Sequence, residues 1–556
     1  MMPPSKHIIF WYILLFILIQ LIGLNYEPCF EEFRDYEAYH SILHGKLPYV
    51  DYRWVYGPIG PFFYALIFRV FGSELLVLRI TAVIFGCLGI LLAYSISKFL
   101  LPRKTAAFAG FLAISAFFTF PAHTYNHYLG MLSNLAASLM VFRFIESSKR
   151  GDLFIAGIFS GVSYLVNPLT FGIEISFSII ALLGFIGFAE RQWNRPFFRD
   201  VFIYLCGVSL AALPVYLSIL SRAPFERVFE LYWSHERKFA GLPLIQISLP
   251  RPDMPWDILY ALRSFRYILF RDIANPSLFY LLAIITSSIA LVLSFKWLRD
   301  GSRRIIACGI FFLSILALSK VIYFLYSGPY LTFLGRYYLY PAVILLVFLV
   351  RSLLSDENIK QNKTIRTVII SSCIIAGLSF AVLYHGYRIS NFFLKRWYTM
   401  RAPFVKGIMF NGDHYNRYIL PSEYIKNSSA PDDKVFVMFY DPAYCVLSER
   451  PPLFPEDVYM GLTPYRVMID PARMPHYEGP ALSVGGLILE RMERDKPLFA
   501  LDFVMKKYVY GAPPVGPSSS GIGPEAEKYI RDNYYLAKTF PYSNDESEIR
   551  VYRRKR

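Results

Sequence analysis

Residues Ile8–Leu24, IIFWYILLFILIQLIGL, form an apolar stretch with no charged residue near the start of the chain. A run of this length and composition is typical of a transmembrane helix. It is followed by Asn25, Tyr26, Glu27 and Pro28, and these do not form the small-residue cleavage site of a secretory signal. We therefore expect an uncleaved membrane anchor.

The composition of the whole chain agrees with this first segment. Of its 556 residues, 55% are hydrophobic and 18% are charged, whereas in soluble proteins about a quarter of all residues are charged. This balance excludes an ordinary soluble protein. The net charge of +16 would suggest nucleic-acid binding in a soluble chain, but in a membrane protein its meaning depends on where the charges lie.

Ten further apolar segments follow the first. They lie near residues 76–100, 105–120, 128–145, 153–166, 169–188, 201–220, 278–298, 305–326, 337–354 and 368–387. On hydropathy alone the chain is therefore predicted to be a mainly α, polytopic membrane protein with about eleven transmembrane helices.

The loops between these segments alternate in charge. Every second loop is basic, and these loops contain Arg103, Lys104, Lys149, Arg150, Arg191, Arg195, Arg199, Lys296, Arg299, Arg303, Arg304, Arg351, Lys360, Lys363 and Arg366. The loops at residues 121–126 and 167–168 contain no lysine or arginine. Because basic loops stay in the cytoplasm, the pattern predicts an N-terminus inside and, with an odd number of spans, a C-terminus outside.

This topology leaves three long segments on the outer side: residues 25–75, residues 221–275 and a tail. We expect a transmembrane domain over residues 1–389 and an extracytoplasmic α/β domain over 390–556. Within the tail, strand-like runs lie at 435–440, 498–503 and 549–552, and helical stretches at 487–493 and 524–533.

Cysteines add little to the prediction. Four of the six lie within predicted spans, and no spacing is typical of a zinc site. Cys29 and Cys445 both lie on the predicted outer side, where a disulfide bond between them is permitted, although the sequence does not establish one.

The first outer segment is the richest in side chains that carry chemistry. A helix over residues 33–43 would place Asp35 and Tyr39 near one face and Glu37 on another. This segment would place its carboxylates close to the membrane surface. The alternative interpretation is a solvated belt at the bilayer surface without a catalytic role.

The arrangement of these residues resembles the glycosyltransferase C-fold (GT-C) superfamily, which includes protein O-mannosyltransferases and the aminoarabinose transferase of lipid A. The matching features are Asp35-Tyr36-Glu37, Tyr39, the turn Gly45 to Asp51, Pro58, Pro61, Phe71-Gly72, Arg79 and Gly335-Arg336-Tyr337-Tyr338-Leu339-Tyr340-Pro341. Their order and spacing, and the plan of many spans before an outer tail, resemble the superfamily over nearly the whole chain.

The resemblance implies a membrane glycosyltransferase, inverting at the sugar, that uses a polyprenyl-phosphate sugar as donor. Asp35 and Glu37 would be the catalytic carboxylates, with Asp35 as the general base for the acceptor. A departing lipid phosphate needs cations, and Lys46, Arg53 and Arg336 are predicted to supply them. Alternatively, each of these three is an interfacial residue that extends its charge to water.

Two departures from the superfamily pattern limit what the resemblance implies. Many members have a lysine just before the proline pair, where this chain has Tyr56-Gly57-Pro58, so that phosphate contact must come from elsewhere. The loop His123-Thr124-Tyr125-Asn126-His127 contains no carboxylate, whereas members often have an acid there. Some relatives hold a divalent metal with several acids, so the loss of one acid argues against a metal here. We therefore expect no cofactor, with a divalent metal as the alternative.

Further residues are predicted to line a substrate cavity. Besides Tyr39 and Asp51, they are His235 in the second outer loop and Glu174 and Lys320, which are ionisable residues in apolar segments. An ion pair without a catalytic role would explain Glu174 and Lys320 equally well. A surface loop on lipid headgroups would explain His235.

Two other classes of function compete with a glycosyltransferase. A transporter or flippase of lipid-linked saccharide would show internal repeats and midplane polar groups, whereas these ionisable residues gather at the predicted outer ends. A membrane-anchored sensor would need only one or two spans. We expect a multi-pass protein of a prokaryotic plasma (inner) membrane with its active site outside, acting on a lipid, polysaccharide or protein acceptor. The sequence identifies neither the sugar nor the acceptor.

Overall fold

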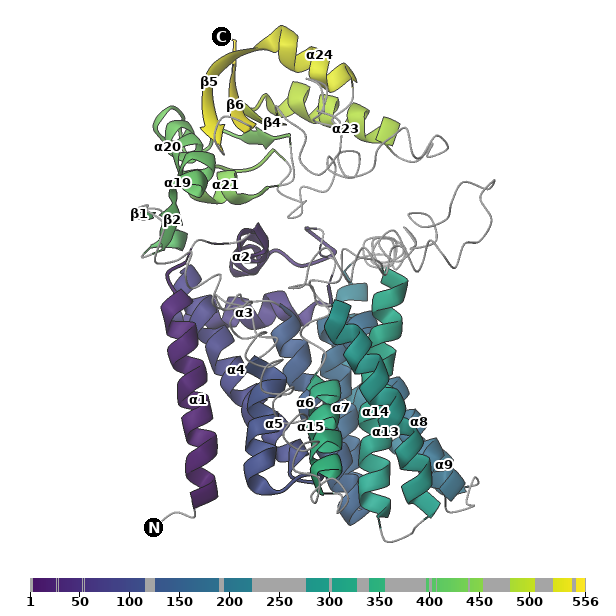
Figure 1. Ribbon diagram of the computed structural model, residues 1–556. Helices are drawn as coiled ribbons and strands as arrows, with labels where there is room; N and C mark the ends of the chain where they lie inside the picture. Colours follow the sequence, from purple (N-terminus) through teal and green to yellow (C-terminus); the bar gives the residue numbers. More distant parts are fainter. Residues whose placement is uncertain are drawn as a thin grey trace, which may run out of the picture. The chain divides into compact units, whose positions relative to one another are not determined.

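The computed structural model describes most of the chain and is mainly helical (Figure 1). It describes residues 4–555 except 27, 29, 53, 55, 116–125, 190–194, 223–276, 300–302, 328–339, 356–396, 400–402, 407, 439–440, 454–480, 506–523 and 543–546. Almost all of the predicted second outer loop, and the predicted span at residues 368–387, therefore lie outside the described residues.

Contacts divide the chain into two compact units, and each has its own fold. The helical unit comprises Met1–Gly23, Val55–Gly60 and Ile80–Asn391. The mixed unit comprises Leu24–Trp54, Pro61–Arg79 and Phe392–Arg556. The predicted division at residue 389 follows chain order, whereas the contacts group most of the first outer segment with the C-terminal residues.

The helical unit is built from long apolar helices. They are α1 (Pro4–Gly23), α4 (Leu75–Ser97, from Ile80 onward), α5 (Arg103–Ser115), α6 (Asn126–Ser147), α7 (Arg150–Val166), α8 (Glu174–Ala189), α9 (Arg195–Leu220), α13 (Ser277–Arg299), α14 (Arg304–Ser327) and α15 (Tyr340–Ser355). Helix α7 packs against α6 and α9, and α14 packs against α8, α13 and α15.

Small residues allow α7 and α9 to approach closely. A Cβ atom at Gly157 would overlap the carbonyl oxygen of Tyr204, and one at Gly207 would overlap the carbonyl oxygen of Phe154. Gly161, four residues after Gly157, faces Val208 and Ala211 in the same way. Such small-residue contacts are typical of helix packing in membranes, where association depends on close van der Waals contact.

Among the described residues, four helices are long and apolar enough to cross a membrane: Leu75–Ser97, His127–Ser147, Phe171–Phe188 and Pro196–Leu220. Shorter apolar helices cover His7–Gly23, Ile59–Phe71, Ala283–Leu298, Arg304–Ser319 and Tyr340–Ser355. With the exception of Ile59–Phe71, which falls in the predicted first outer loop, all of these coincide with predicted spans.

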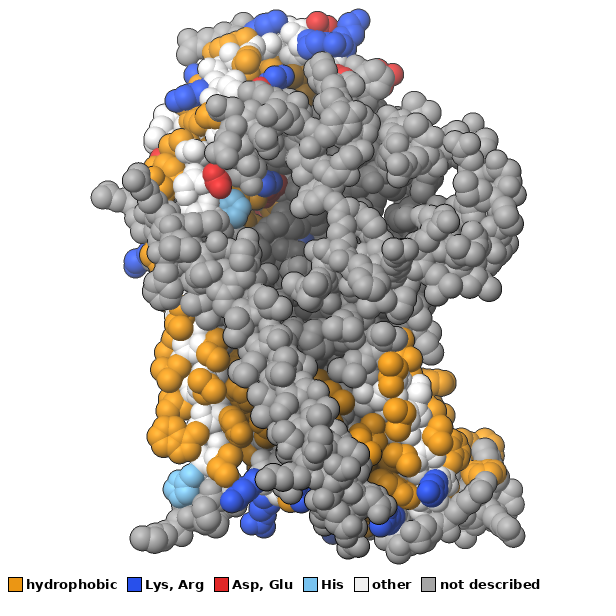
Figure 2. All heavy atoms as spheres, viewed as in Figure 1, with side chains coloured by type: hydrophobic (Ala, Val, Ile, Leu, Met, Phe, Trp, Pro, Cys, Tyr) orange, Lys and Arg blue, Asp and Glu red, His pale blue; other side chains and the backbone are white. Residues whose placement is uncertain are grey.

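The surface of the helical unit has a clear distribution of side chains. Hydrophobic side chains cover its sides, and lysine and arginine gather at the end where α1 begins (Figure 2). Exposed Phe10, Trp11, Phe202, Leu217 and Val292 belong to the apolar surface. An exposed apolar surface of this extent is typical of a protein in contact with lipid.

The mixed unit contains a four-stranded sheet in the order β3-β4-β6-β5. Its strands are β3 (Val435–Val437), β4 (Phe499–Met505), β5 (Tyr534–Tyr542) and β6 (Ser547–Arg554). Strands β3 and β4 pair in parallel, and the other pairs are antiparallel. Three strands, β3, β4 and β6, coincide with predicted strand-like runs. Strand β5 was not predicted.

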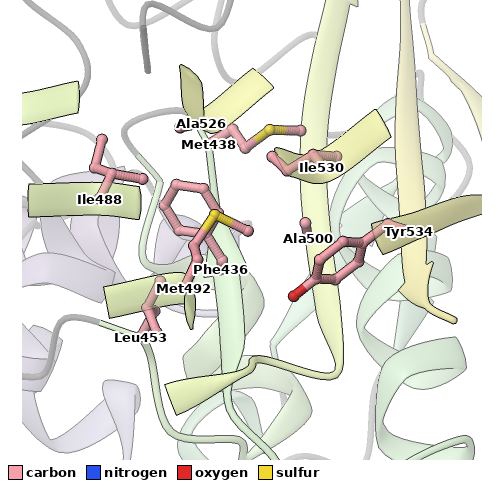
Figure 3. Close-up of a cluster of buried hydrophobic side chains, with 9 residues drawn as sticks. All are labelled: Phe436, Met438, Leu453, Ile488, Met492, Ala500, Ala526, Ile530 and Tyr534. Carbon is pink, nitrogen blue, oxygen red and sulfur yellow. The ribbon is translucent and has the colours of Figure 1, made fainter. Parts of the chain in front are cut away.

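Helices α23 (Ala481–Asp495) and α24 (Pro524–Asn533) pack with this sheet, and both contain predicted helical stretches. Their apolar side chains meet those of the strands in one core (Figure 3). The core consists of Phe436, Met438, Leu453, Ile488, Met492, Ala500, Ala526, Ile530 and Tyr534. A second, two-stranded sheet pairs β1 (Trp397–Thr399) with β2 (Met409–Asn411).

Two helices of the first outer segment also contribute to the mixed unit. They are α2 (Phe30–Leu43) and α3 (Ile59–Phe71), the latter from Pro61 onward. Helix α2 packs against α21 (Ala443–Ser448) of the C-terminal region. Phe33 and Tyr36 of α2 also make ring contacts with Phe404. The acidic helix predicted at residues 33–43 is therefore present and has neighbours from the tail.

Gly57 provides a test of packing in the helical unit. Its N–H donates to the Val166 carbonyl at 2.8 Å, and a Cβ atom there would overlap the carbonyl of Leu165. We predict that Gly57→Ala lowers the free energy of unfolding by about 1–3 kcal/mol, because backbone atoms have to move. Thermal unfolding in one detergent would measure this. Gly151→Ala is the matched control, since a Cβ atom there meets nothing within 4 Å. Equal stability of the two variants would contradict the prediction.

Candidate active site

Helix α2 presents Asp35 and Tyr39 on one face, as the helical spacing predicts. The Tyr39 hydroxyl donates to Asp35 Oδ2 at 3.3 Å. Both residues are fully buried, with 0% of their surface exposed. Tyr39 stacks on Tyr64 of α3 and meets the edge of Trp54, so its ring is fixed by aromatic neighbours. This face of α2 therefore buries a carboxylate next to a tyrosine that is itself held by aromatic neighbours.

The other oxygen of Asp35 is held by the preceding residue. Arg34 places Nε at 2.8 Å and Nη2 at 2.7 Å from Asp35 Oδ1, and both side chains are buried. Residues next to each other on a helix do not ordinarily face each other. The arginine side chain must therefore turn back along the helix to make this pair. Sequence reasoning missed the role of Arg34.

A second buried ion pair lies one turn earlier on α2. Arg79 of α4 donates from Nε and Nη2 to the two oxygens of Glu32, at 2.9 and 2.8 Å. Its Nη1 also donates to the carbonyls of Leu24 and Tyr26. The sequence identified Arg79 only as part of a motif. The signal that could have revealed its role was a charged residue inside an apolar segment.

The opposite face of α2 carries Glu37, which is half-buried. Burial raises the pKa of this carboxyl, and the nearby charges of Lys46 and His44 oppose that rise only in part. Asp35 and Glu37 therefore lie in different environments. One is paired with a buried arginine, whereas the other has only partly compensating cations. Their shared role as catalytic carboxylates stays a prediction for both residues.

A further buried acid, Asp441, belongs to the tail segment beside α21. Burial raises the pKa of Asp441, and Arg417, whose Nη2 lies 3.5 Å from Oδ2, opposes this rise. The Cys445 thiol lies close enough to Glu37 and Asp441 to sense both, and its pKa is raised by burial first and by these acids next. Cys445 is a free thiol, and Cys29 lies outside the described residues. Neither Asp441 nor Arg417 was identified from the sequence.

The turn after α2 is closed by hydrogen bonds of its own. Asp51 Oδ2 accepts from the Leu47 N–H at 2.7 Å, and the Tyr49 N–H donates to the Tyr52 carbonyl at 2.8 Å. The Tyr52 hydroxyl reaches back to the Ala38 carbonyl at 3.2 Å. Asp51, predicted to line a cavity, is exposed and stabilises this turn. Lys46 lies in the same turn, near Glu37.

The remaining predicted residues are more dispersed. Glu174 is buried at the start of α8, directly after a π-helical turn (Pro168–Ile173), and belongs to the helical unit. Lys320 lies in α14, but only its backbone is described. Arg53, His235 and Arg336 lie outside the described residues. Among the residues that the structure describes, no group of three or more His, Cys, Asp or Glu is arranged to hold a metal ion.

Comparison with known proteins supports the resemblance seen in the sequence. A family profile described as dolichyl-phosphate-mannose-protein mannosyltransferase matches residues 56–220. A comparison with curated protein sequences gives no significant match. Among solved structures, ArnT from Cupriavidus metallidurans, bound to undecaprenyl phosphate, is similar with a TM-score of 0.56 at 12% identity. The match covers 99% of this chain and 98% of that one.

Oligosaccharyltransferase structures from Archaeoglobus fulgidus are also similar. AglB in complex with an inhibitory peptide and a dolichol-phosphate gives a TM-score of 0.53 at 12% identity, covering 96% of this chain and 80% of that one. A complex with Zn and sulfate gives 0.53 at 15% identity, covering 95% and 73%. At such identities the likeness shows the fold. The family profile over residues 56–220 and this shared fold agree with the resemblance inferred from the sequence.

The raised pKa of Glu37 predicts a pH-dependent stability. A carboxyl whose pKa is higher in the folded protein than in the unfolded chain contributes most to stability at low pH. That contribution is lost as the pH rises from about 4.5 through the folded pKa. We therefore expect Glu37→Gln to gain stability relative to wild type between pH 4.5 and pH 7.5. Melting temperatures at the two pH values would measure it.

The exposed Asp432 provides the control for this experiment. The difference in melting temperature between Asp432→Asn and wild type should stay nearly constant over the same range. A difference for Glu37→Gln that also stays constant would contradict the assignment of a raised pKa to Glu37.

Proposed function

We propose that this protein is a membrane glycosyltransferase that transfers a sugar from a polyprenyl-phosphate donor to an acceptor, with Asp35 as the general base. The observation that carries the proposal is the fully buried Asp35 on α2, held by Arg34 and Tyr39 in a chain with the GT-C fold. Support also comes from the family profile, which describes dolichyl-phosphate-mannose-dependent enzymes.

For this reaction the protein mainly has to position the acceptor, the donor and the general base. An acceptor hydroxyl or amine attacks the anomeric carbon of the donor, the bond from that carbon to the phosphate oxygen breaks, and the acceptor proton passes to Asp35. The sugar is inverted by this single displacement. A general base needs hydrogen-bond reach and a fixed orientation. The Tyr39 hydrogen bond and the aromatic neighbours of Tyr39 supply the orientation.

The donor class is proposed from the relatives. The similar ArnT structure is bound to undecaprenyl phosphate, and the similar AglB structure is bound to a dolichol-phosphate. A lipid carrier of this kind would explain why the fold is built from apolar helices. Lys46, Arg53 and Arg336 are proposed to contact its phosphate. Glu37 is proposed as the second catalytic carboxylate, and Tyr39, Asp51, Glu174, His235 and Lys320 are proposed to contribute to the substrate cavity. The acceptor would be a lipid, a polysaccharide or a protein.

The proposed site lies on the outer side of the plasma membrane. Two observations support this orientation: the alternation of basic loops along the sequence, and the lysine and arginine side chains at the end of the helical unit where α1 begins (Figure 2). Basic residues near span ends remain in the cytoplasm. Chain order then puts α2 and the C-terminal region on the outer side.

The role of Asp35 is tested by Asp35→Asn, which keeps the shape of the side chain and removes its basicity. In membranes supplied with radiolabelled polyprenyl-phosphate sugars, we expect the transfer rate to fall by about 100-fold or more, the usual contribution of general-base catalysis. Asp432→Asn is the matched control, because Asp432 is an exposed aspartate of the same unit. Full transfer by a folded Asp35→Asn protein would exclude Asp35 as the base.

The orientation is tested by single cysteines placed at two exposed positions. Asp432→Cys should react with a membrane-impermeant maleimide added to intact cells, whereas Lys104→Cys should react only after the membrane is permeabilised. Labelling is measured above the signal of the native cysteines. Reaction of Lys104→Cys in intact cells, or protection of Asp432→Cys, would reverse the proposed topology.

A further inference from the structure

The pair Arg34 and Asp35 differs from the other buried ion pair of α2. Arg79 donates to both side-chain oxygens of Glu32 and to the carbonyls of Leu24 and Tyr26. It thereby joins the start of α4 to α2 and to the segment before α2. Arg34 donates from Nε to Asp35 Oδ1, and its Nη2 lies 2.7 Å from the same oxygen. The first arrangement holds the chain together. The second places a cation on the carboxylate to which we assign the proton transfer.

A guanidinium in this position has a direct effect on the chemistry. While Nε donates to Oδ1 at 2.8 Å and the guanidinium charge lies against it, that oxygen is not available to an acceptor proton. A cation held on a carboxylate also opposes its protonation. Asp35 can take up a proton at low energetic cost only if the positive charge finds another partner as the proton arrives.

We propose that Arg34 is a phosphate-binding residue, whose guanidinium passes from Asp35 to the phosphate of the lipid carrier as the sugar is transferred. The inference rests on the proposed function and adds to it a cation that the sequence motifs do not identify.

Charge balance supports this exchange. Before transfer, Arg34 carries +1, Asp35 carries −1 and the phosphodiester of the donor carries −1. During transfer the electron pair of the breaking bond goes to the phosphate oxygen, and the acceptor proton goes to Asp35. Afterwards Arg34 carries +1, Asp35 is neutral and the carrier phosphate carries −2. The sum is −1 throughout, while the negative charge moves from the carboxylate to the phosphate.

The geometry of arginine suits this movement. Its planar guanidinium has five N–H donors and binds a carboxylate or a phosphate with two parallel hydrogen bonds. An interaction with the phosphate that strengthens as charge develops lowers the barrier, because it is greater in the transition state than in the ground state. Arg34 is only 5% exposed, so water would weaken such an interaction little.

The experiment measures binding of undecaprenyl phosphate, which carries no sugar, to the full-length protein in detergent. If Arg34 is shared between the carboxylate and the phosphate, Asp35→Asn releases it and tightens binding by roughly tenfold or more, as expected for a charge-assisted hydrogen bond. The double variant Arg34→Gln with Asp35→Asn should lose this gain. The double variant is used because Arg34→Gln alone leaves a buried carboxylate without its cation and is prone to misfold.

Arg69→Gln is the matched control, since Arg69 is an exposed arginine of α3. Its affinity should equal that of wild type. Equal affinity of Asp35→Asn and the double variant, with wild type binding the lipid, would overturn the role of Arg34 and leave the proposed function standing. Failure of wild type to bind the lipid at all would overturn both.

Discussion

The mixed unit depends on one buried ion pair, Arg79 with Glu32. A buried charge is costly unless its hydrogen bonds are satisfied, and Arg79 meets this condition with four oxygens. Two of them are the carbonyls of Leu24 and Tyr26, which follow the last residue of α1 and therefore lack helical donors. The pair thus fixes the start of α2, and Asp35 lies one helical turn beyond Glu32. The position of the proposed base follows from a contact that takes no part in the chemistry.

Helix α2 places its two central acids, Asp35 and Glu37, on opposite faces. Asp35 faces Tyr39, whose ring contacts Trp54 and Tyr64, whereas Glu37 lies near Lys46 and the free thiol of Cys445. Environments that treat two carboxyls differently give them different protonation behaviour, and this is how paired acids divide their roles. The tail supplies part of the second environment through α21. A change in the tail would therefore act on Glu37 more directly than on Asp35.

Local patterns in the sequence predicted local features of the structure. The 3.6-residue period placed Asp35 and Tyr39 on one face of a helix, and that contact is present at 3.3 Å. The predicted stretch at residues 524–533 coincides with α24. Strand β5 was not predicted because it follows α24 without a turn and contains Pro541. The proline is tolerated because β5 is an edge strand of the sheet. The pair between Arg79 and Glu32 joins positions 47 residues apart, and no periodicity encodes such a contact.

Arg34 shows why the site was harder to predict than the fold. It stands next to Asp35 in the sequence, but neighbouring helical positions point in different directions, so adjacency alone suggested no interaction. The contact exists because an arginine side chain is long enough to turn back to Oδ1. Reversing that turn would move the charge away from the helix axis without moving the backbone. A cation that can change partners in this way stabilises the ionised carboxylate before transfer and the phosphate after it, whereas a cation fixed like Arg79 would favour only one of the two states.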